Sequence, residues 1–285
     1  MPELMVHGET NRKWTVIALL CAVFLAAMEA TAVATVMPTI VGDLGGLDRY
    51  SWVFTAYMMS STITVPIYGK LADLYGRKPI LQFGIGLFLI GSTLSAFAGT
   101  MNQLILFRAI QGLGAGAIQP MGLTITGDIF KMEERARITA IFGTVWGVAG
   151  ISGPMIGSVI VEFLGWPWIY LVNIPFGLAA AFIIQRSLRE KIERKKVKLD
   201  WLGAFFLSAA ISCTLLAVNA REDSVIFVPL STFCFIAFLL VEQRAAEPIV
   251  PLDMFSNPVI SNASLVSLML GGAMLTFVTF LPLYI

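Results

Sequence analysis

Nine long apolar runs dominate this sequence of 285 residues. A helix that spans a bilayer needs about 20 mostly apolar residues. Runs of that length predict spans at roughly 14–37, 51–71, 80–98, 103–127, 137–161, 166–186, 200–220, 224–242 and 258–285. Lipid offers no hydrogen bonds to the backbone, so long continuous runs of this kind must be helical. The sequence therefore predicts an all-α membrane protein with about nine spans.

The composition agrees, because only 13% of the residues are charged and 57% are hydrophobic. Soluble domains carry about 25% charged residues, so we expect membrane lipid to cover much of the surface. A net charge of +1 does not indicate the basic surface that nucleic-acid binding needs. The single histidine, His7, lies in the polar N-terminal tail, which leaves no histidine cluster for a metal. No cofactor site and no catalytic constellation is predicted, so an enzyme is not expected.

The basic residues predict the orientation of the chain. Cytoplasmic loops of membrane proteins carry an excess of Lys and Arg. One predicted side collects 16 of the 19 basic residues, and the other holds only Arg49 and Arg221. This places the N-terminus in the cytoplasm of a multi-pass protein of the cell membrane. The most basic connection, RSLREKIERKKVK, is predicted to be a solvated anchor, with a specific lipid-headgroup site as the alternative.

Two ionisable residues lie at membrane depth. Glu29 lies within FLAAMEATAVATVMP in the first span, and Arg108 begins the pattern RAIQGLGAGA in the fourth. A carboxylate at the centre of a membrane helix costs roughly 2.5–3.5 kcal/mol on insertion scales, and such residues usually mark function. A static buried ion pair between the two helices is the alternative. Gln111 and small residues share the Arg108 face of the helix, which predicts close packing there.

Two further stretches carry glycine-based motifs. The loop GKLADLYGRKPIL follows the second span, and its notable residues are Gly69, Asp73, Gly76, Arg77 and Lys78. An ordinary basic turn is the simpler interpretation. The fifth span, FGTVWGVAGISGPMIGSVI, places glycines along one face, which predicts a tight helix seam with a kink at Pro154. That face comprises Gly143, Gly147, Gly150, Gly153 and Gly157.

Together these stretches resemble the major facilitator superfamily. The loop is similar to its signature between the second and third helices, with Leu74 in place of the usual basic residue. The fifth span resembles its antiporter motif, although Ala149 and Ser158 replace two glycines. Glu29, Thr31 and Pro38 resemble the first helix of the fourteen-helix drug:proton antiporter family, where Asp is the common acid.

This resemblance implies a domain organisation. It consists of an N-terminal six-helix transport bundle (1–186), a basic cytoplasmic linker (187–199), two additional helices (200–242) and the start of a second bundle (243–285). The chain ends at TFLPLYI, inside the ninth apolar run. We therefore expect a truncated protein or a fragment, which lacks the C-terminal half that a complete transporter needs.

The resemblance also implies proton-coupled efflux of amphipathic, often cationic, drugs by alternating access. Glu29 would carry the proton and Arg108 would modulate it. Asp73 and its loop would latch the cytoplasmic side. Thr31, Tyr57, Gln111 and Trp146 are candidates for the substrate cavity. A carrier for a specific metabolite and a non-transporting remnant remain alternatives, whereas no G-x-x-x-x-G-K-[ST] motif supports an ATP-driven pump.

Overall fold

The structure is a computed structural model that describes residues 10–190, 200–219, 224–245 and 248–280, without the side chains of 218–219 and 272–280. The described residues are almost entirely helical. The elements are α1 (Arg12–Leu44), η1 (Leu47–Arg49), α2 (Tyr50–Tyr75), α3 (Arg77–Ala96), α4 (Met101–Ile129), α5 (Met132–Leu164), α6 (Pro167–Leu171), α7 (Asn173–Ser187), α8 (Trp201–Asn219), α9 (Ser224–Glu242), η2 (Leu252–Ser256) and α10 (Pro258–Phe280). Helices thus occupy every predicted span, which confirms the all-α fold class. One predicted span differs, because the helix over 166–186 is interrupted at Val172.

Local sequence signals set where these helices begin and end. The side chain of Asn11 accepts a hydrogen bond from the backbone N–H of Trp14 at the start of α1 (3.3 Å). Thr100 does the same for Gln103 at the start of α4 (3.3 Å). Gly76 both ends α2 and begins α3, with a φ of +93° that favours glycine. A single residue therefore joins these two helices.

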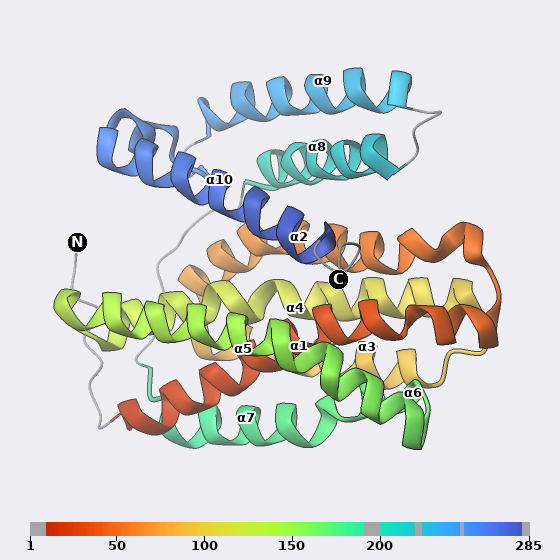
Figure 1. The fold of residues 1–285 in the computed structure, drawn as a ribbon. Coiled ribbons are helices and arrows are strands. Elements are labelled where there is room, and N and C mark those ends of the chain that lie inside the picture. The colour runs from red at the N-terminus through yellow and green to blue at the C-terminus, as the bar shows by residue number, and fades with distance from the viewer. Residues whose placement is uncertain (1–9, 191–199, 220–223, 246–247, 281–285) are drawn as a thin grey trace.

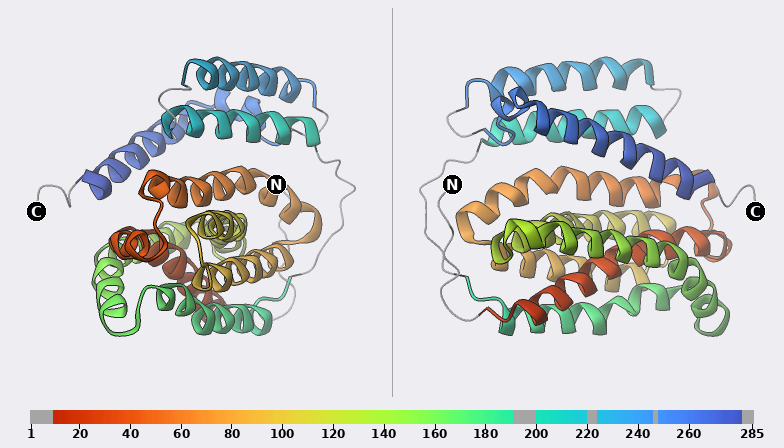
Figure 2. Two further views of the ribbon diagram at one scale, coloured as in Figure 1. Left: turned by 90° about the vertical axis from the view of Figure 1, so that its right-hand side faces the viewer. Right: turned by 60° about the vertical axis from the view of Figure 1, so that its left-hand side comes forward.

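Helices α1 to α7 form one bundle (Figure 1). Within it α4 packs on α2 and α3, and α1 packs on α5 and α7. Helices α8 and α9 form a hairpin beside this bundle, and α8 faces α2 (Figure 2). Helix α10 packs on η2. Its described side chains, from Pro258 to Gly271, are exposed apart from the half-buried Ile260.

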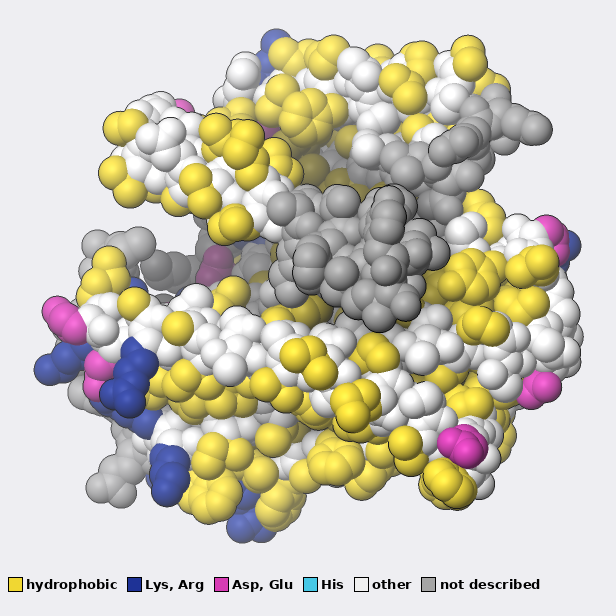
Figure 3. Space-filling model, viewed as in Figure 1, with side chains coloured by type: hydrophobic (Ala, Val, Ile, Leu, Met, Phe, Trp, Pro, Cys, Tyr) yellow, Lys and Arg dark blue, Asp and Glu magenta, His cyan; other side chains and the backbone are white. Residues whose placement is uncertain are grey.

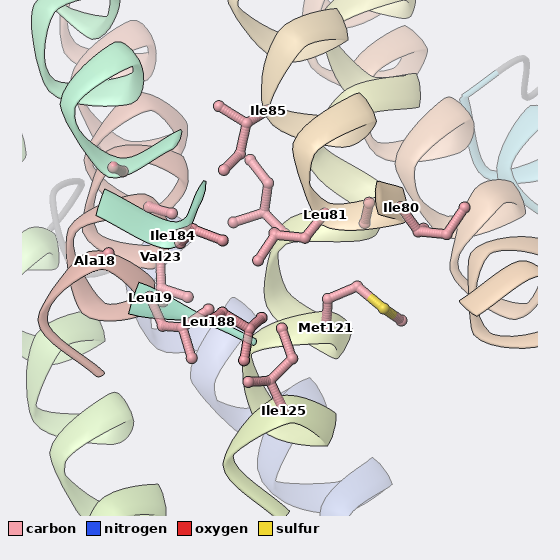
Figure 4. Close-up of a cluster of buried hydrophobic side chains, with 14 of the residues drawn as sticks. Ala18, Leu19, Val23, Ile80, Leu81, Ile85, Met121, Ile125, Ile184 and Leu188 are labelled. Carbon is pink, nitrogen blue, oxygen red and sulfur yellow. The ribbon is translucent and has the colours of Figure 1, made fainter. Parts of the chain in front are cut away.

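A cluster of aliphatic side chains fills one half of the bundle (Figure 4). It joins α1, α3, α4 and α7 through Ala18, Leu19, Val23, Ile80, Leu81, Ile85, Met121, Ile125 and Ile184. A second cluster, built around Val33, Met37, Ile40, Leu104 and Tyr170, fills the other half. The polar residues described below lie between these two apolar layers.

The surface suits a lipid environment. A broad apolar face separates two charged ends, and most visible Lys and Arg side chains gather at one of them (Figure 3). Five helical segments are long and apolar enough to cross a membrane: Arg12–Leu44, Arg77–Ala96, Met132–Leu164, Pro167–Ser187 and Ser224–Glu242. Helices α2 and α4 fall outside this set, and both carry Ser, Thr, Gln or Gly residues where they pack together. The apolar stretches of α8 and α10 within the described residues are shorter.

The predicted domain boundaries stay a prediction. Residues 191–199 of the expected linker lie outside the described residues, as do 281–285 at the end of the ninth predicted span.

Candidate functional site

The two ionisable residues predicted at membrane depth form a buried ion pair. Glu29 comes from α1 and is 0% exposed, and Arg108 comes from α4 and is 1% exposed. Arg108 Nη1 lies 2.7 Å from Glu29 Oε1. Removing two charges from water is costly, and only close pairing with additional hydrogen bonds offsets that cost. The surrounding residues supply those bonds.

Gln111 provides the first of them on the same helix. The Nη1 group of Arg108 also donates to Gln111 Oε1 at 2.7 Å, and Gln111 is fully buried. Helix α2 approaches α4 at the next residue, Gly112. A Cβ atom there would lie 2.1 Å from Ser60 Oγ and 2.4 Å from the Tyr57 carbonyl oxygen. The predicted close packing on this face of α4 is thus present, and it brings Tyr57 to the pair.

Two tyrosine rings lie near the guanidinium group. Arg108 Cζ is 4.2 Å from the centre of the Tyr57 ring and 5.9 Å from that of Tyr170. An aromatic face attracts a desolvated cation by about 2 kcal/mol or more. The rings therefore help to stabilise a permanent positive charge inside the bundle.

Asn173 and Ser92 complete the site, and sequence reasoning missed both. Asn173 begins α7 directly after the interruption at Val172, and its Nδ2 donates to Glu29 Oε2 and to Ser92 Oγ. Ser92, on α3, donates to the Tyr170 carbonyl oxygen at 2.8 Å. The side chains of Glu29, Ser92 and Asn173 are all buried. The only signal in the sequence was a neutral polar residue in the apolar run YLVNIPFG.

The other predicted cavity residues lie apart from this polar network. Thr31 donates to the Ala149 carbonyl oxygen of α5 at 3.1 Å and to that of Met28 at 3.0 Å, so it takes part in the α1–α5 contact. Trp146, on α5, packs against the core and against a small cluster around Ala27, Met28 and Ala149. Its buried Nε1 has no hydrogen-bond partner among the described residues.

The glycine face of α5 is only partly a helix seam. A Cβ at Gly153 would lie 2.0 Å from Thr31 Oγ1, and one at Gly157 would lie 3.3 Å from Ala32 Cβ. Gly143, Gly147 and Gly150 have nothing within 4 Å of that position among the described residues. Helix α5 continues through Pro154 as one element. The predicted tight seam therefore covers only the part of the face beyond Gly150.

The glycine-containing loop forms a second polar cluster at one end of the bundle. Arg77 Nε lies 2.5 Å from Asp128 Oδ2 at the end of α4, and Arg77 Nη2 lies 3.7 Å from Asp73. Asp73 itself is largely exposed. A Cβ on Gly69 would meet nothing within 4 Å in the described part of the chain.

Glu190 links this loop to the end of α7. Its two carboxylate oxygens accept the backbone N–H groups of Arg77 and Lys78, at 2.9 and 3.0 Å, at the start of α3. Lys78 Nζ in turn donates to the carbonyl oxygens of Gln185 and Leu188, at 2.9 and 2.8 Å. An anion at a helix N-terminus and a cation at a helix C-terminus are both favourable. Sequence reasoning missed Glu190, because it stands in a strongly basic segment.

Within the described residues, no group of three or more His, Cys, Asp or Glu side chains is placed to hold a metal ion.

Sequence comparison relates the chain to known transporters. A family model described as Major Facilitator Superfamily matches residues 19–285. Multidrug resistance protein 3 of Bacillus subtilis (strain 168) is 39% identical over 286 residues, which cover 97% of this chain and 56% of that protein. The multidrug transporter protein MdtP of the same organism is 34% identical over 284 residues, covering 97% and 52%. The chain thus spans about half the length of the curated relatives it matches.

Solved structures show the same fold at low sequence identity. The human organic anion transporter MFSD10 (TETRAN) matches with a TM-score of 0.59 and 17% identity, over 71% of this chain and 55% of that one. An auto-inhibited POT family peptide transporter matches with a TM-score of 0.53 and 15% identity, over 80% and 50%. Both cover about half of the solved chain.

Proposed function

Since this chain belongs to the major facilitator superfamily, we propose that the whole protein expels amphipathic, often cationic, drugs across the cell membrane in exchange for protons. The names of its multidrug relatives support drug efflux as the transport activity. Membership of a transporter family also supports a non-enzymatic role. The complete transporter requires a second bundle, which would face the first across a central cavity.

The observation that carries this proposal is the fully buried pair of Glu29 and Arg108 between the two apolar layers. Intramembrane ionisable groups commonly mark ion and proton pathways. A guanidinium group stays protonated in proteins, so Glu29 is the member of the pair that changes charge. In the proposed cycle a proton and a drug cation compete with each other for this carboxylate. Exchange follows if the charged and neutral forms favour opposite openings of the transporter.

The cavity residues proposed for drug binding are Tyr57, Gln111, Trp146 and Thr31. Tyr57 already contacts the guanidinium group with its ring, which is the contact that a drug cation would also make. Trp146 Nε1, which has no hydrogen-bond partner among the described residues, offers a donor on α5. Binding of a drug cation near Glu29 would displace Arg108 from the carboxylate.

We place the N-terminus in the cytoplasm. Hydrogen bonds and ion pairs join the start of α1 to the end of α7 (Asn11 to Ser187, 3.1 Å) and Arg12 to Glu134 of α5 (4.0 Å). These ends carry most of the basic residues, in agreement with the positive-inside rule. The exposed Asp73 at the same end is proposed to latch against the second bundle when the cytoplasmic side closes.

The test uses Glu29→Gln in the protein expressed from its complete gene. Everted membrane vesicles are energised, and drug uptake and drug-induced proton release are measured. We expect the variant to reach the membrane in normal amount and to lose pH-driven transport, because an amide cannot exchange a proton. Undiminished pH-driven drug transport would refute the assignment of Glu29.

The same vesicles distinguish the direction of coupling. Drug-induced release of protons from the everted lumen marks antiport. Movement of drug and protons in the same direction marks symport, and would favour an uptake carrier for a specific metabolite over an exporter.

A further inference from the structure

Asn173 connects the carboxylate of Glu29 to the interruption between α6 and α7. Its Nδ2 group uses both N–H bonds, one to Glu29 Oε2 and one to Ser92 Oγ (3.0 Å). The Ser92 hydroxyl donates in turn to the carbonyl oxygen of Tyr170 (2.8 Å), which lies in α6 three residues before α7 begins. The amide of Asn173 therefore bonds α1 and α3 directly, and it reaches the last turn of α6 through Ser92.

The oxygen atom of the same amide makes no hydrogen bond within the described residues. Asn173 Oδ1 is buried and has no hydrogen-bond partner among the described residues. A buried polar atom without a partner costs about 1–3 kcal/mol. A fold that keeps such an atom next to an ionisable group invites a functional explanation.

A change in the protonation state of Glu29 would explain why this oxygen atom is kept without a partner. An ionised carboxylate only accepts hydrogen bonds, whereas a protonated carboxyl group must donate its O–H to an acceptor. Arg108 has donors only. Gln111 Oε1 already accepts from Arg108. Asn173 Oδ1 is thus an acceptor without a partner among the described residues, and it belongs to a residue already bonded to Glu29.

Few titratable or charged groups face Glu29. They are Arg108 from α4, Tyr57 from α2 and Tyr170 from α6, each in electrostatic contact with the pair. Helices α3 and α7 present the neutral Ser92 and Asn173. The charged residues of α5 lie near its two ends: Glu133, Glu134, Arg135, Arg137 and Glu162.

We propose that Asn173 is a positioning residue that serves both protonation states of Glu29 by turning over its side-chain amide. When Glu29 is ionised, Nδ2 donates to its carboxylate, as in the structure. When Glu29 binds a proton, the amide turns so that Oδ1 accepts the new O–H. No covalent bond other than the O–H of the acid forms or breaks. This inference rests on the proposed role of Glu29 as the proton carrier.

The turn of the amide also changes the bonds of Ser92. With Oδ1 facing it, the Ser92 hydroxyl donates to the amide and releases the Tyr170 carbonyl oxygen. That carbonyl belongs to the last turn of α6, just before the interruption at Val172. The charge of Glu29 is thereby transmitted to the one interruption inside the bundle.

The test measures Glu29 directly in the protein from its complete gene, reconstituted in lipid. Infrared difference spectra between low and high pH contain the C=O stretch of protonated Glu29, identified by its loss in Glu29→Gln. In Asn173→Leu, which has a similar volume but no polar atoms, we expect this band to move to higher frequency, as for an acid without an acceptor.

A second variant is expected to shift the pH midpoint of drug-induced proton release in a defined direction. Asn173→Asp offers an acceptor but no amide donor, so two carboxylates share one proton. We expect the pH midpoint of drug-induced proton release to rise by about one unit, a tenfold gain in proton affinity. A residue with a purely structural role would lower transport without moving this midpoint.

Two serines on α3 form the matched control, in case the Asn173 variants do not fold. Ser92 and Ser95 are both 0% exposed, but Ser95 Oγ has no hydrogen-bond partner among the described residues. Ser92→Ala removes the acceptor that holds the amide toward the ionised acid, so the midpoint rises, by less than in Asn173→Asp. Ser95→Ala leaves it unchanged. Equal midpoints in both serine variants would overturn the proposal.

The outcomes separate the two proposals. If Glu29→Gln abolishes proton coupling while the Asn173 variants keep the wild-type band and midpoint, the amide turn is wrong and the proposed function stands. If Glu29→Gln retains coupling, the proposed function fails and the inference fails with it.

Discussion

The contact between α2 and α4 at Gly112 yields a prediction whose size follows from the coordinates. In Gly112→Ala the new methyl group would lie 2.1 Å from Ser60 Oγ and 2.4 Å from the backbone carbonyl oxygen of Tyr57. A backbone atom cannot rotate away, so the two helices must separate. Overpacking of this kind costs about 1–3 kcal/mol. Separation of the helices also withdraws the Tyr57 ring from Arg108.

Gly86 on α3 provides the matched control. It is exposed and helical, and a Cβ there would meet nothing within 4 Å among the described residues. Replacement of glycine by alanine in a helix interior gains about 1 kcal/mol in both variants. That gain cancels when the two are compared, so Gly112→Ala is expected to unfold about 1–3 kcal/mol more easily than Gly86→Ala.

The assay is equilibrium unfolding in mixed micelles, titrated with SDS and followed by tryptophan fluorescence. Drug efflux is measured in parallel, and only Gly112→Ala is expected to impair it. Equal free energies of unfolding for the two variants would show that α2 and α4 do not pack closely at Gly112.

Two further predictions concern charged residues. Arg108→Lys is expected to slow drug efflux about tenfold or more, because a compact ammonium cannot reproduce the planar contacts that the guanidinium group makes; turnover at the wild-type rate would contradict this. Glu190→Ala is expected to lower the free energy of unfolding by about 1–2 kcal/mol, since the first N–H groups of α3 lose their acceptor. The exposed Glu162, replaced by Ala in the same unfolding assay, is the control and should change little.

Much of the fold was predictable, because membrane depth imposes a simple rule on the sequence. Within the described residues each of the nine apolar runs is a helix, or in one case a helix with a break. The sequence indicated two ionisable residues at membrane depth, with a buried ion pair as one alternative, but only the structure shows that Glu29 and Arg108 are in contact. Close packing at Gly112 followed from small residues on one helix face.

The rest of the site depends on how each helix is rotated about its axis. Asn173 and Ser92 are ordinary polar residues in apolar runs, and nothing in their spacing says which helix they face. The glycine face of α5 shows the same limit, because here the sequence predicted more contact than the structure contains. Its regular spacing predicts a single seam, but in the described part of the chain only Gly153 and Gly157 meet α1. Glu190 was hidden by its basic neighbours, although its role depends on position and not on local charge.

The cap that Glu190 places on α3 has a consequence for how such proteins can be recombined. The first bundle holds its own last helix in place through this carboxylate and through Lys78. A chimaera joined after residue 190 would inherit the closing contact together with the bundle. A junction only four residues earlier would separate the cap from the helix start that it serves. The best junction for exchanging halves among relatives therefore lies after Glu190, even though α7 already ends at Ser187.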